Sequence, residues 1–303
     1  MKTVLSLLPL PLLLTAAGAE SGQNLAQLYA DYGRLIVTQF VSAPFPHASR
    51  AQGHSWGKDF FPADKHYSDS TVAIFIPRGL RGRQRVDFVV HFHGWGNHVS
   101  AVLAQHQLVE QLVASKRNAV LVVPQGPRDA SDSCGGKLED PDGFKRFMGE
   151  TMATLRFRDR RAFHNSRMGN IILCGHSGGY RAIAFILAQG GVTENVREVW
   201  LFDGLYGQTE KFMDWFDRQR CRFVNIYTER GGTKRETEAL MANLKGKGTP
   251  FLAQNDVESS PQSLQTNRLI FLYTDLSHNG VVNKRSMFGE LLKTSCLGES
   301  SAR

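Results

Sequence analysis

Cysteine is scarce in this sequence: the 303 residues include only four, Cys134, Cys174, Cys221 and Cys296. Their spacings match no zinc-binding pattern, and they are too few for a small disulfide-rich scaffold. Cys174 lies inside an apolar segment, so we expect a buried free thiol there. The four cysteines allow three complete pairings, and a Cys221–Cys296 bond is compatible with the sequence. A chain of this length nevertheless buries a core that needs no disulfide.

Positive charge is in slight excess, but it is not gathered as a nucleic-acid site requires. The 36 Lys and Arg against 28 Asp and Glu give a formal net charge of +8, and they are spread along the sequence. Two small basic clusters occur at 78–85 and 156–161, and Phe157 is the one aromatic residue within them. Because binding of single-stranded nucleic acid relies on aromatic stacking beside the charges, we predict a solvated surface and no nucleic-acid partner.

The sequence lacks any second long apolar run besides the one at its N-terminus. Lys2 supplies a short basic end, residues 4–14 are apolar but interrupted by two prolines, and Ala17-Gly18-Ala19 forms a small-x-small cleavage site before Glu20. The apolar run is shorter than a typical membrane-spanning helix, and the pattern is typical of a secretory signal peptide. We predict a signal peptide over 1–19 and a secreted or periplasmic mature chain, 20–303, without an integral membrane segment. An uncleaved anchor is the alternative.

Apolar, β-branched segments alternate with helical patterns through most of the chain. The strand-like segments are 72–76, 86–92, 119–123, 170–174, 199–202, 223–227 and 269–273. Helices are expected at 24–40, at 99–115, from an Asp140-Pro141 cap onward, at 209–218 and at 234–245. Near-continuous apolar strands that alternate with helices indicate a mostly parallel sheet covered on both faces. Since no repeat or linker interrupts the pattern, we predict one α/β domain.

The most informative segment is Gly175-His176-Ser177-Gly178-Gly179, which matches Gly-x-Ser-x-Gly. An apolar strand precedes it, and apolar residues at helical spacing follow it. In such a turn the serine is held in a strained backbone conformation with its hydroxyl above the sheet. The motif alone is common, and a glycine-rich turn is the alternative interpretation. The strand before it and the helix after it favour a nucleophilic serine.

A second polar segment, His93-Gly94-Trp95-Gly96, follows the strand predicted at 86–92. The rival interpretation is a metal site, because His91 and His93 would share one strand face and His98 lies close in sequence. No carboxylate or further histidine cluster nearby would complete the coordination sphere. We therefore predict no metal and consider this segment as part of a catalytic turn.

Further candidate groups follow later strands. His278 lies in a polar loop after the last predicted strand, and Asp275 lies just before it. Asp203 follows the strand at 199–202 and precedes a glycine, while Glu229 follows the strand at 223–227. The carboxyl ends of parallel strands meet at one edge of a sheet, which is where open α/β sheets place their active sites. These groups should therefore lie near Ser177.

The serine turn, the His-Gly turn and the late histidine together resemble the α/β-hydrolases over residues 70–295. The resemblance implies that Ser177 is a nucleophile and that His278 is its general base. It also implies an oxyanion hole formed by backbone N–H groups of the Gly94-Trp95 turn and of Gly178.

The resemblance leaves the triad acid open. In the family it usually follows the second strand after the nucleophile strand, which is the place of Glu229; some members have it one strand earlier, at the place of Asp203. We favour Asp203, because a short aspartate between a strand and a glycine is held more firmly than a glutamate beside Arg230 and two glycines. Asp275 is the third possibility.

These features predict a serine hydrolase that acts through an acyl-enzyme on a carboxylic ester, with no cofactor. Amide cleavage by the same triad and a non-catalytic binding protein with the same fold are the alternatives. The short segment between the strands at 199–202 and 223–227 has no room for a cap domain. We therefore expect an open site, bordered by loops at 126–140 and 246–267, that takes a small or polymeric ester.

Overall fold

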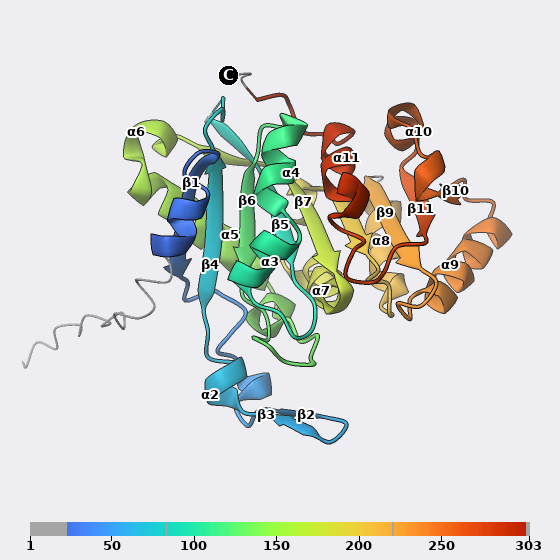
Figure 1. Cartoon of the computed structure of the whole chain (residues 1–303), viewed down its shortest axis with the longest axis horizontal. Coiled ribbons are helices and arrows are strands. Elements are labelled where there is room, and N and C mark those ends of the chain that lie inside the picture. Colours follow the sequence, from blue (N-terminus) through green and yellow to red (C-terminus); the bar gives the residue numbers. More distant parts are fainter. Residues whose placement is uncertain (1–22, 83, 220, 301–303) are drawn as a thin grey trace, which may run out of the picture.

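The computed structural model describes residues 23–82, 84–219 and 221–300 (Figure 1). The predicted signal peptide, 1–19, and its cleavage site before Glu20 lie outside these residues. A nine-stranded sheet has the order β1-β4-β6-β5-β7-β8-β9-β11-β10, and a hairpin, β2–β3, forms a separate small sheet. The strands are β1 (Gly33–Gln39), β2 (His54–Trp56), β3 (Asp59–Phe61), β4 (Thr71–Pro77), β5 (Arg85–Phe92), β6 (Val120–Pro124), β7 (Arg167–His176), β8 (Val196–Phe202), β9 (Arg222–Thr228), β10 (Leu252–Asn255) and β11 (Leu269–Thr274).

The large sheet is parallel except at one end. β1 pairs antiparallel with β4, and β4 pairs antiparallel with β6. The remaining neighbours, from β6 through β5, β7, β8, β9 and β11 to β10, are all parallel. The loops that leave the carboxyl ends of these parallel strands therefore gather along one edge of the sheet.

Helices cover both faces of the sheet. One core cluster contains buried side chains of α3 (Val99–Gln105), α4 (Leu108–Ser115), α10 (Pro261–Thr266) and α11 (Met287–Lys293). The other contains those of α5 (Gly143–Arg158), α6 (Arg160–Phe163), α7 (Tyr180–Gln189), α8 (Thr209–Gln219) and α9 (Lys234–Gly246). The predicted fold class, a mostly parallel sheet with helices on both faces, is confirmed.

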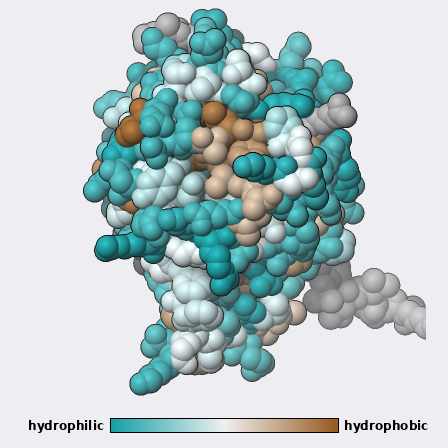
Figure 2. Space-filling model, turned by 90° about the vertical axis from the view of Figure 1, so that its right-hand side faces the viewer, coloured by the Kyte–Doolittle hydropathy of each residue, from teal (hydrophilic) through white to brown (hydrophobic). Residues whose placement is uncertain are grey.

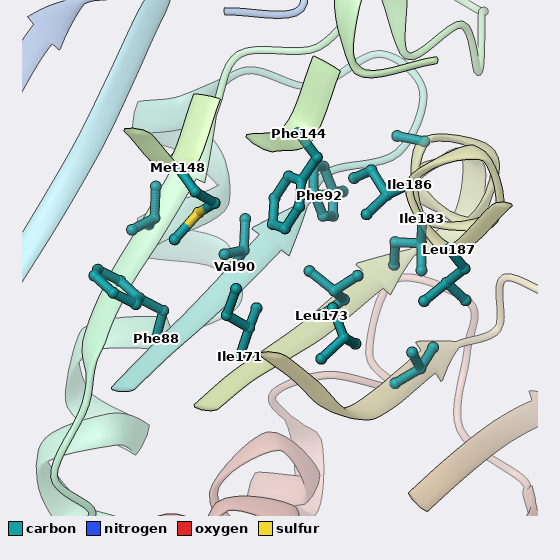
Figure 3. Close-up of a cluster of buried hydrophobic side chains, with 14 of the residues drawn as sticks. Phe88, Val90, Phe92, Phe144, Met148, Ile171, Leu173, Ile183, Ile186 and Leu187 are labelled. Atoms are coloured by element: carbon teal, nitrogen blue, oxygen red, sulfur yellow. The ribbon is translucent and has the colours of Figure 1, made fainter. Parts of the chain in front are cut away.

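Successive side chains along each strand point to opposite faces of the sheet and so contribute to the two core clusters in turn. Phe88 and Val90 of β5 belong to the cluster under α5 and α7, whereas Val89 belongs to the opposite one. Figure 3 shows part of the cluster under α5 and α7, in which β5 and β7 lie beneath Phe144 and Ile183. These layers fix the two strands that carry the serine turn and the His-Gly turn.

The helix predicted over 24–40 is wrong in its second half. Residues 23–28 are helical, but β1 occupies Gly33–Gln39. There the chain pairs with β4 over its whole length, from Gly33 opposite Pro77 to Gln39 opposite Thr71. The run Leu-Ile-Val-Thr within β1 fits a pleated surface well. Pairing with the sheet therefore outweighs the amphipathic pattern.

Three smaller expectations also need correction. The helix predicted over 99–115 is split into α3 and α4, because Gln107 adopts a left-handed conformation with φ 50°. Helix α5 begins at Gly143, after the cap residue Asp142 rather than at Asp140-Pro141. The stretch 246–267, expected as a loop, contains β10 and α10.

All four cysteines are free thiols, and Cys134, Cys174 and Cys221 are buried. The expectation of a buried free thiol at Cys174 is confirmed, and no Cys221–Cys296 disulfide forms. In the part of the chain that the structure describes, no helix has the length and apolar character needed to cross a membrane.

The edge of the sheet that ends in β10 faces the viewer in Figure 2. This side of the molecule is largely hydrophilic, with a hydrophobic area near its centre. β10 has only four residues, none of them fully buried. A short edge strand of this kind offers little backbone for pairing with another chain.

Candidate active site

Four polar segments meet at the carboxyl ends of neighbouring strands. Ser177 follows β7, Trp95 follows β5, Asp203 follows β8 and His278 lies beyond β11. β5, β7 and β8 are adjacent in the sheet, and β11 lies two strands beyond β8. Because these strands are parallel, segments that are far apart in the sequence share one surface.

Ser177 lies in a tight turn, η3 (Ser177–Gly179), between β7 and α7. Its φ is 52°, in the left-handed region that non-glycine residues seldom adopt, so the backbone is strained at this serine. The turn after β5 passes close above it. A Cβ on Gly94 would lie 2.6 Å from the Ser177 Cβ and 3.1 Å from its Oγ, so this position has room only for glycine.

The next residue of that turn, Trp95, lies against Gly178. Its indole Cδ1 is 2.7 Å from where a Cβ on Gly178 would be, and its Nε1–H donates to the Ser133 hydroxyl at 2.7 Å. Within the described residues no acceptor pairs with the backbone N–H of Trp95 or of Gly178. Two backbone donors next to the serine are thus free to bind an oxygen that develops negative charge.

His278 contacts Asp203, and its Nδ1 lies 2.7 Å from the Asp203 Oδ2. Asp203 is 0% exposed. It also accepts hydrogen bonds from the Thr228 N–H at 3.2 Å, the Thr228 hydroxyl at 2.7 Å and the Thr233 hydroxyl. The carboxylate therefore has donors on both oxygens, and the Nδ1 of His278 carries the proton. In the neutral imidazole with this tautomer, the lone pair is on the other nitrogen, Nε2.

These donors keep Asp203 ionised despite its burial. Burial alone would raise the pKa of this carboxyl, but the hydrogen bonds from His278, Thr233 and Thr228 outweigh it and lower the pKa below the usual value. No sequence motif marks the two threonines as partners of Asp203. The same is true of Gly231, where a Cβ would lie 1.6 Å from the Asp203 Oδ2.

Glu229 and Asp275, the other acid candidates, have different partners. Glu229 is exposed and pairs with the Lys234 Nζ at 2.8 Å. Asp275 is exposed and pairs with Arg285 at 2.6 Å. The carboxylate that the structure brings to His278 is thus that of Asp203, one strand after the nucleophile strand.

A chain of buried imidazoles lies behind His278. The His176 Nε2–H donates to the His278 carbonyl oxygen at 2.8 Å, and the two rings lie 4.7 Å apart between centroids. The His106 ring lies 5.0 Å from that of His176, and its Nδ1 is 3.2 Å from the His91 Nε2. The series continues to the Cys174 Sγ, 3.5 Å from the His91 Nδ1. The three imidazoles come from separate elements, β5, the end of α3 and β7, so their spacing along the chain carries no signal.

The histidines of the rival metal interpretation do not converge. His91 faces His106, while the Nδ1 of His93 lies 2.8 Å from the Gly94 carbonyl oxygen. His98 pairs with Asp129 at 2.7 Å. In the described parts of the chain no group of three or more His, Cys, Asp or Glu side chains is arranged to hold a metal ion.

Burial makes these internal imidazoles poor bases. Burial first, and neighbouring imidazoles second, lower the pKa of His176 to about 4 and that of His106 to about 3. The same causes lower the pKa of His91. The three rings therefore stay neutral at neutral pH. In the unfolded chain each would bind a proton near its ordinary pKa of about 6.5.

We expect the protein to lose stability as the pH falls from about 6.5 toward 4. The unfolded state binds more protons than the folded state in this window, so each buried imidazole lowers the free energy of unfolding by about 1.4 kcal/mol per pH unit. His176 and His106 together give about 3 kcal/mol per unit near pH 5. Protonation of Asp203 lowers the free energy of unfolding only below about pH 4, because the pKa of this carboxyl is lowered in the folded state. Urea unfolding at pH 7, 6 and 5 measures the slope. His106→Phe should reduce it, and equal stability at pH 7 and 5 would contradict the interpretation.

Comparisons of the sequence with protein-family models and with curated proteins found no match. Comparison of the structure with solved structures did find similar chains. A protein designated FAE has a TM-score of 0.51 at 11% sequence identity, covering 86% of this chain and 88% of its own. A ferulic acid esterase has a TM-score of 0.50 at 12% identity, covering 86% of this chain and 95% of its own. With its strand order and serine turn, the chain has the α/β-hydrolase fold.

Proposed function

We propose that this protein is a serine hydrolase that cleaves carboxylic esters with the triad Ser177, His278 and Asp203. The observation that carries the proposal is the buried, ionised Asp203 on the Nδ1 of His278, at the same end of the sheet as a serine held at φ 52°. An imidazole fixed in this tautomer presents Nε2 as a base, which is the arrangement that a nucleophilic serine needs.

In the proposed reaction, the Ser177 Oγ forms a bond to the ester carbonyl carbon while its proton passes to the Nε2 of His278. The carbonyl oxygen becomes an oxyanion, which the backbone N–H groups of the Gly94-Trp95 turn and of Gly178 stabilise. The imidazolium, held by Asp203, then gives its proton to the leaving alkoxide as the carbon–oxygen bond breaks. Water repeats the sequence on the acyl-enzyme and releases the acid and Ser177.

An ester is favoured over an amide because the likeness in fold includes a protein named as a ferulic acid esterase. Amide cleavage uses the same groups and stays the second candidate. A non-catalytic binding protein has no need of a buried carboxylate with donors on both oxygens.

We further propose a single-domain mature chain, 20–303, that is secreted or periplasmic and needs no cofactor. Support for its export comes from the basic end, apolar run and cleavage site of the sequence.

Labelling with a fluorophosphonate probe tests the proposal without knowledge of the substrate. We expect one covalent adduct on the folded protein, mapped by mass spectrometry to the peptide that contains Ser177, and none on heat-denatured protein. The folded protein should also hydrolyse 4-nitrophenyl butyrate much faster than the matching butyryl anilide. A folded protein that neither reacts with the probe nor cleaves either compound would refute the proposed function.

A further inference from the structure

Two large aromatic side chains are exposed beside the candidate site. Trp95 is 40% exposed and Trp56 is 53% exposed. Trp95 belongs to the turn above Ser177, while Trp56 belongs to the β2–β3 hairpin, which projects from the body of the molecule (Figure 1). Exposed aromatic groups that are gathered together indicate a binding surface more often than singly scattered ones do.

The hairpin contacts the catalytic turn through these rings. Trp56 and Trp95 pack edge to face, with centroids 4.9 Å apart and an interplanar angle of 70°. In this arrangement the face of one ring meets the edge of the other, and such pairs are favourable beyond the area that they bury. Phe60 pairs with Ser55 in the middle of the hairpin, on the face opposite to that of Trp56, and its ring packs against Gly53.

A partly buried ion pair links the loop around Ser133, which holds the Trp95 indole, to the segment before the hairpin. The Arg50 guanidinium donates to both carboxylate oxygens of Asp132, at 2.6 and 3.0 Å. Asp132 is buried, and the next residue, Ser133, accepts the hydrogen bond from the Trp95 indole. The aromatic surface is thus preorganised on both of the segments that build it, and a ligand need not order it on binding.

A further aromatic residue lies on the side of Ser177 toward β8. Tyr206 contacts the Tyr180 ring, with centroids 5.8 Å apart, and its hydroxyl donates to the Gly231 carbonyl oxygen at 2.5 Å. The segment after β8 that carries Tyr206 lies against the serine turn, because a Cβ on Gly204 would lie 3.0 Å from the Ser177 carbonyl oxygen. The serine therefore has exposed aromatic groups both toward the hairpin and toward β8.

We infer that Trp95 and Trp56 form a subsite for a ring of the substrate that flanks the scissile ester. This inference rests on the proposed ester hydrolysis. The ligand chemistry is a ring with an apolar face, because indole groups bind such faces by stacking and offer no charge to an ionic group. Such a ring comes from an aromatic acid or alcohol, or from a pyranose. An ester without a ring leaves this surface uncovered.

The test compares Trp56 variants on two matched pairs of esters. Methyl 3-phenylpropanoate against methyl hexanoate examines an aromatic ring, and an acetylated methyl glucopyranoside against glycerol triacetate examines a pyranose. We expect Trp56→Ala to lower kcat/KM about tenfold for the ring-bearing member of one pair, which is the scale of about one stacked ring. For the open-chain member the loss should be smaller, about threefold or less. The pair that shows the difference identifies the source of the ring.

Two control variants complete the experiment. Trp56→Phe keeps a ring at this position and should retain most of the preference for the ring-bearing ester. Phe157→Ala removes an 84%-exposed aromatic ring near the end of α5, and it should leave all four rates unchanged. Equal losses within both pairs, or no loss in either, would overturn the ring subsite. Wild-type protein inactive on all four esters and unreactive with the fluorophosphonate would instead overturn the proposed function.

Discussion

Replacement of Asp203 by asparagine should lower kcat by about a thousandfold or more, on the scale of triad acids. The aspartate accepts four hydrogen bonds, two on each oxygen. An asparagine has one oxygen and one NH2 group in place of the two carboxylate oxygens, so its NH2 group would face hydrogen-bond donors at one of these two positions. It would therefore either leave the Thr228 and Thr233 donors without an acceptor or favour the wrong His278 tautomer, in which Nε2 carries the proton.

Glu229→Gln is the matched control for this prediction. It makes the same acid-to-amide change on an exposed side chain that pairs with Lys234, and surface pairs of this kind contribute little. We expect kcat to change by less than about tenfold, a range that excludes a triad role. Steady-state kinetics on variants with native circular dichroism decide between the two carboxylates. The reverse ranking would make Glu229 the acid, and two small effects would favour Asp275 or a catalytic dyad.

The largest loss is expected for Ser177→Ala, which should abolish fluorophosphonate labelling and lower kcat by about 10⁵-fold or more. The substitution removes only a hydroxyl, so folding and the melting temperature should stay close to those of the wild type. Ser286→Ala is the matched control, because Ser286 also has a left-handed backbone, with φ 50°, but is exposed and outside the triad. It should keep full labelling. Undiminished turnover by a clean preparation of Ser177→Ala would refute the covalent mechanism.

The sheet was predictable because its strands are buried on both faces, and such strands appear in the sequence as short, continuous apolar runs. β1 was not recognised, since its residues satisfy a helical pattern as well and only the pairing with β4 decides between the two. β10 was not recognised because it is four residues long and only partly buried. Local sequence patterns do not indicate an edge strand whose stability comes from pairing with one neighbouring strand.

The candidate site was predictable where its chemistry lies in a short motif. The Gly-x-Ser-x-Gly turn and a carboxylate at a strand end are visible in the sequence, and their position follows from the parallel sheet. Thr228 and Thr233 gave no signal, because threonine is common and their role depends on where the Asp203 oxygens point. The His91–His106–His176 series depends likewise on packing among three separate elements.

The close approach of Gly94 to Ser177 and of Gly231 to Asp203 limits how this protein can be engineered. Backbone atoms form these walls, so the pocket cannot be reshaped there by an exchange of side chains. A directed-evolution library that varies the two glycines would yield mostly inactive clones. Variation at Trp56 and Tyr206 changes side chains that reach solvent at the rim. New substrate preferences would therefore be selected at the rim, while the centre stays fixed.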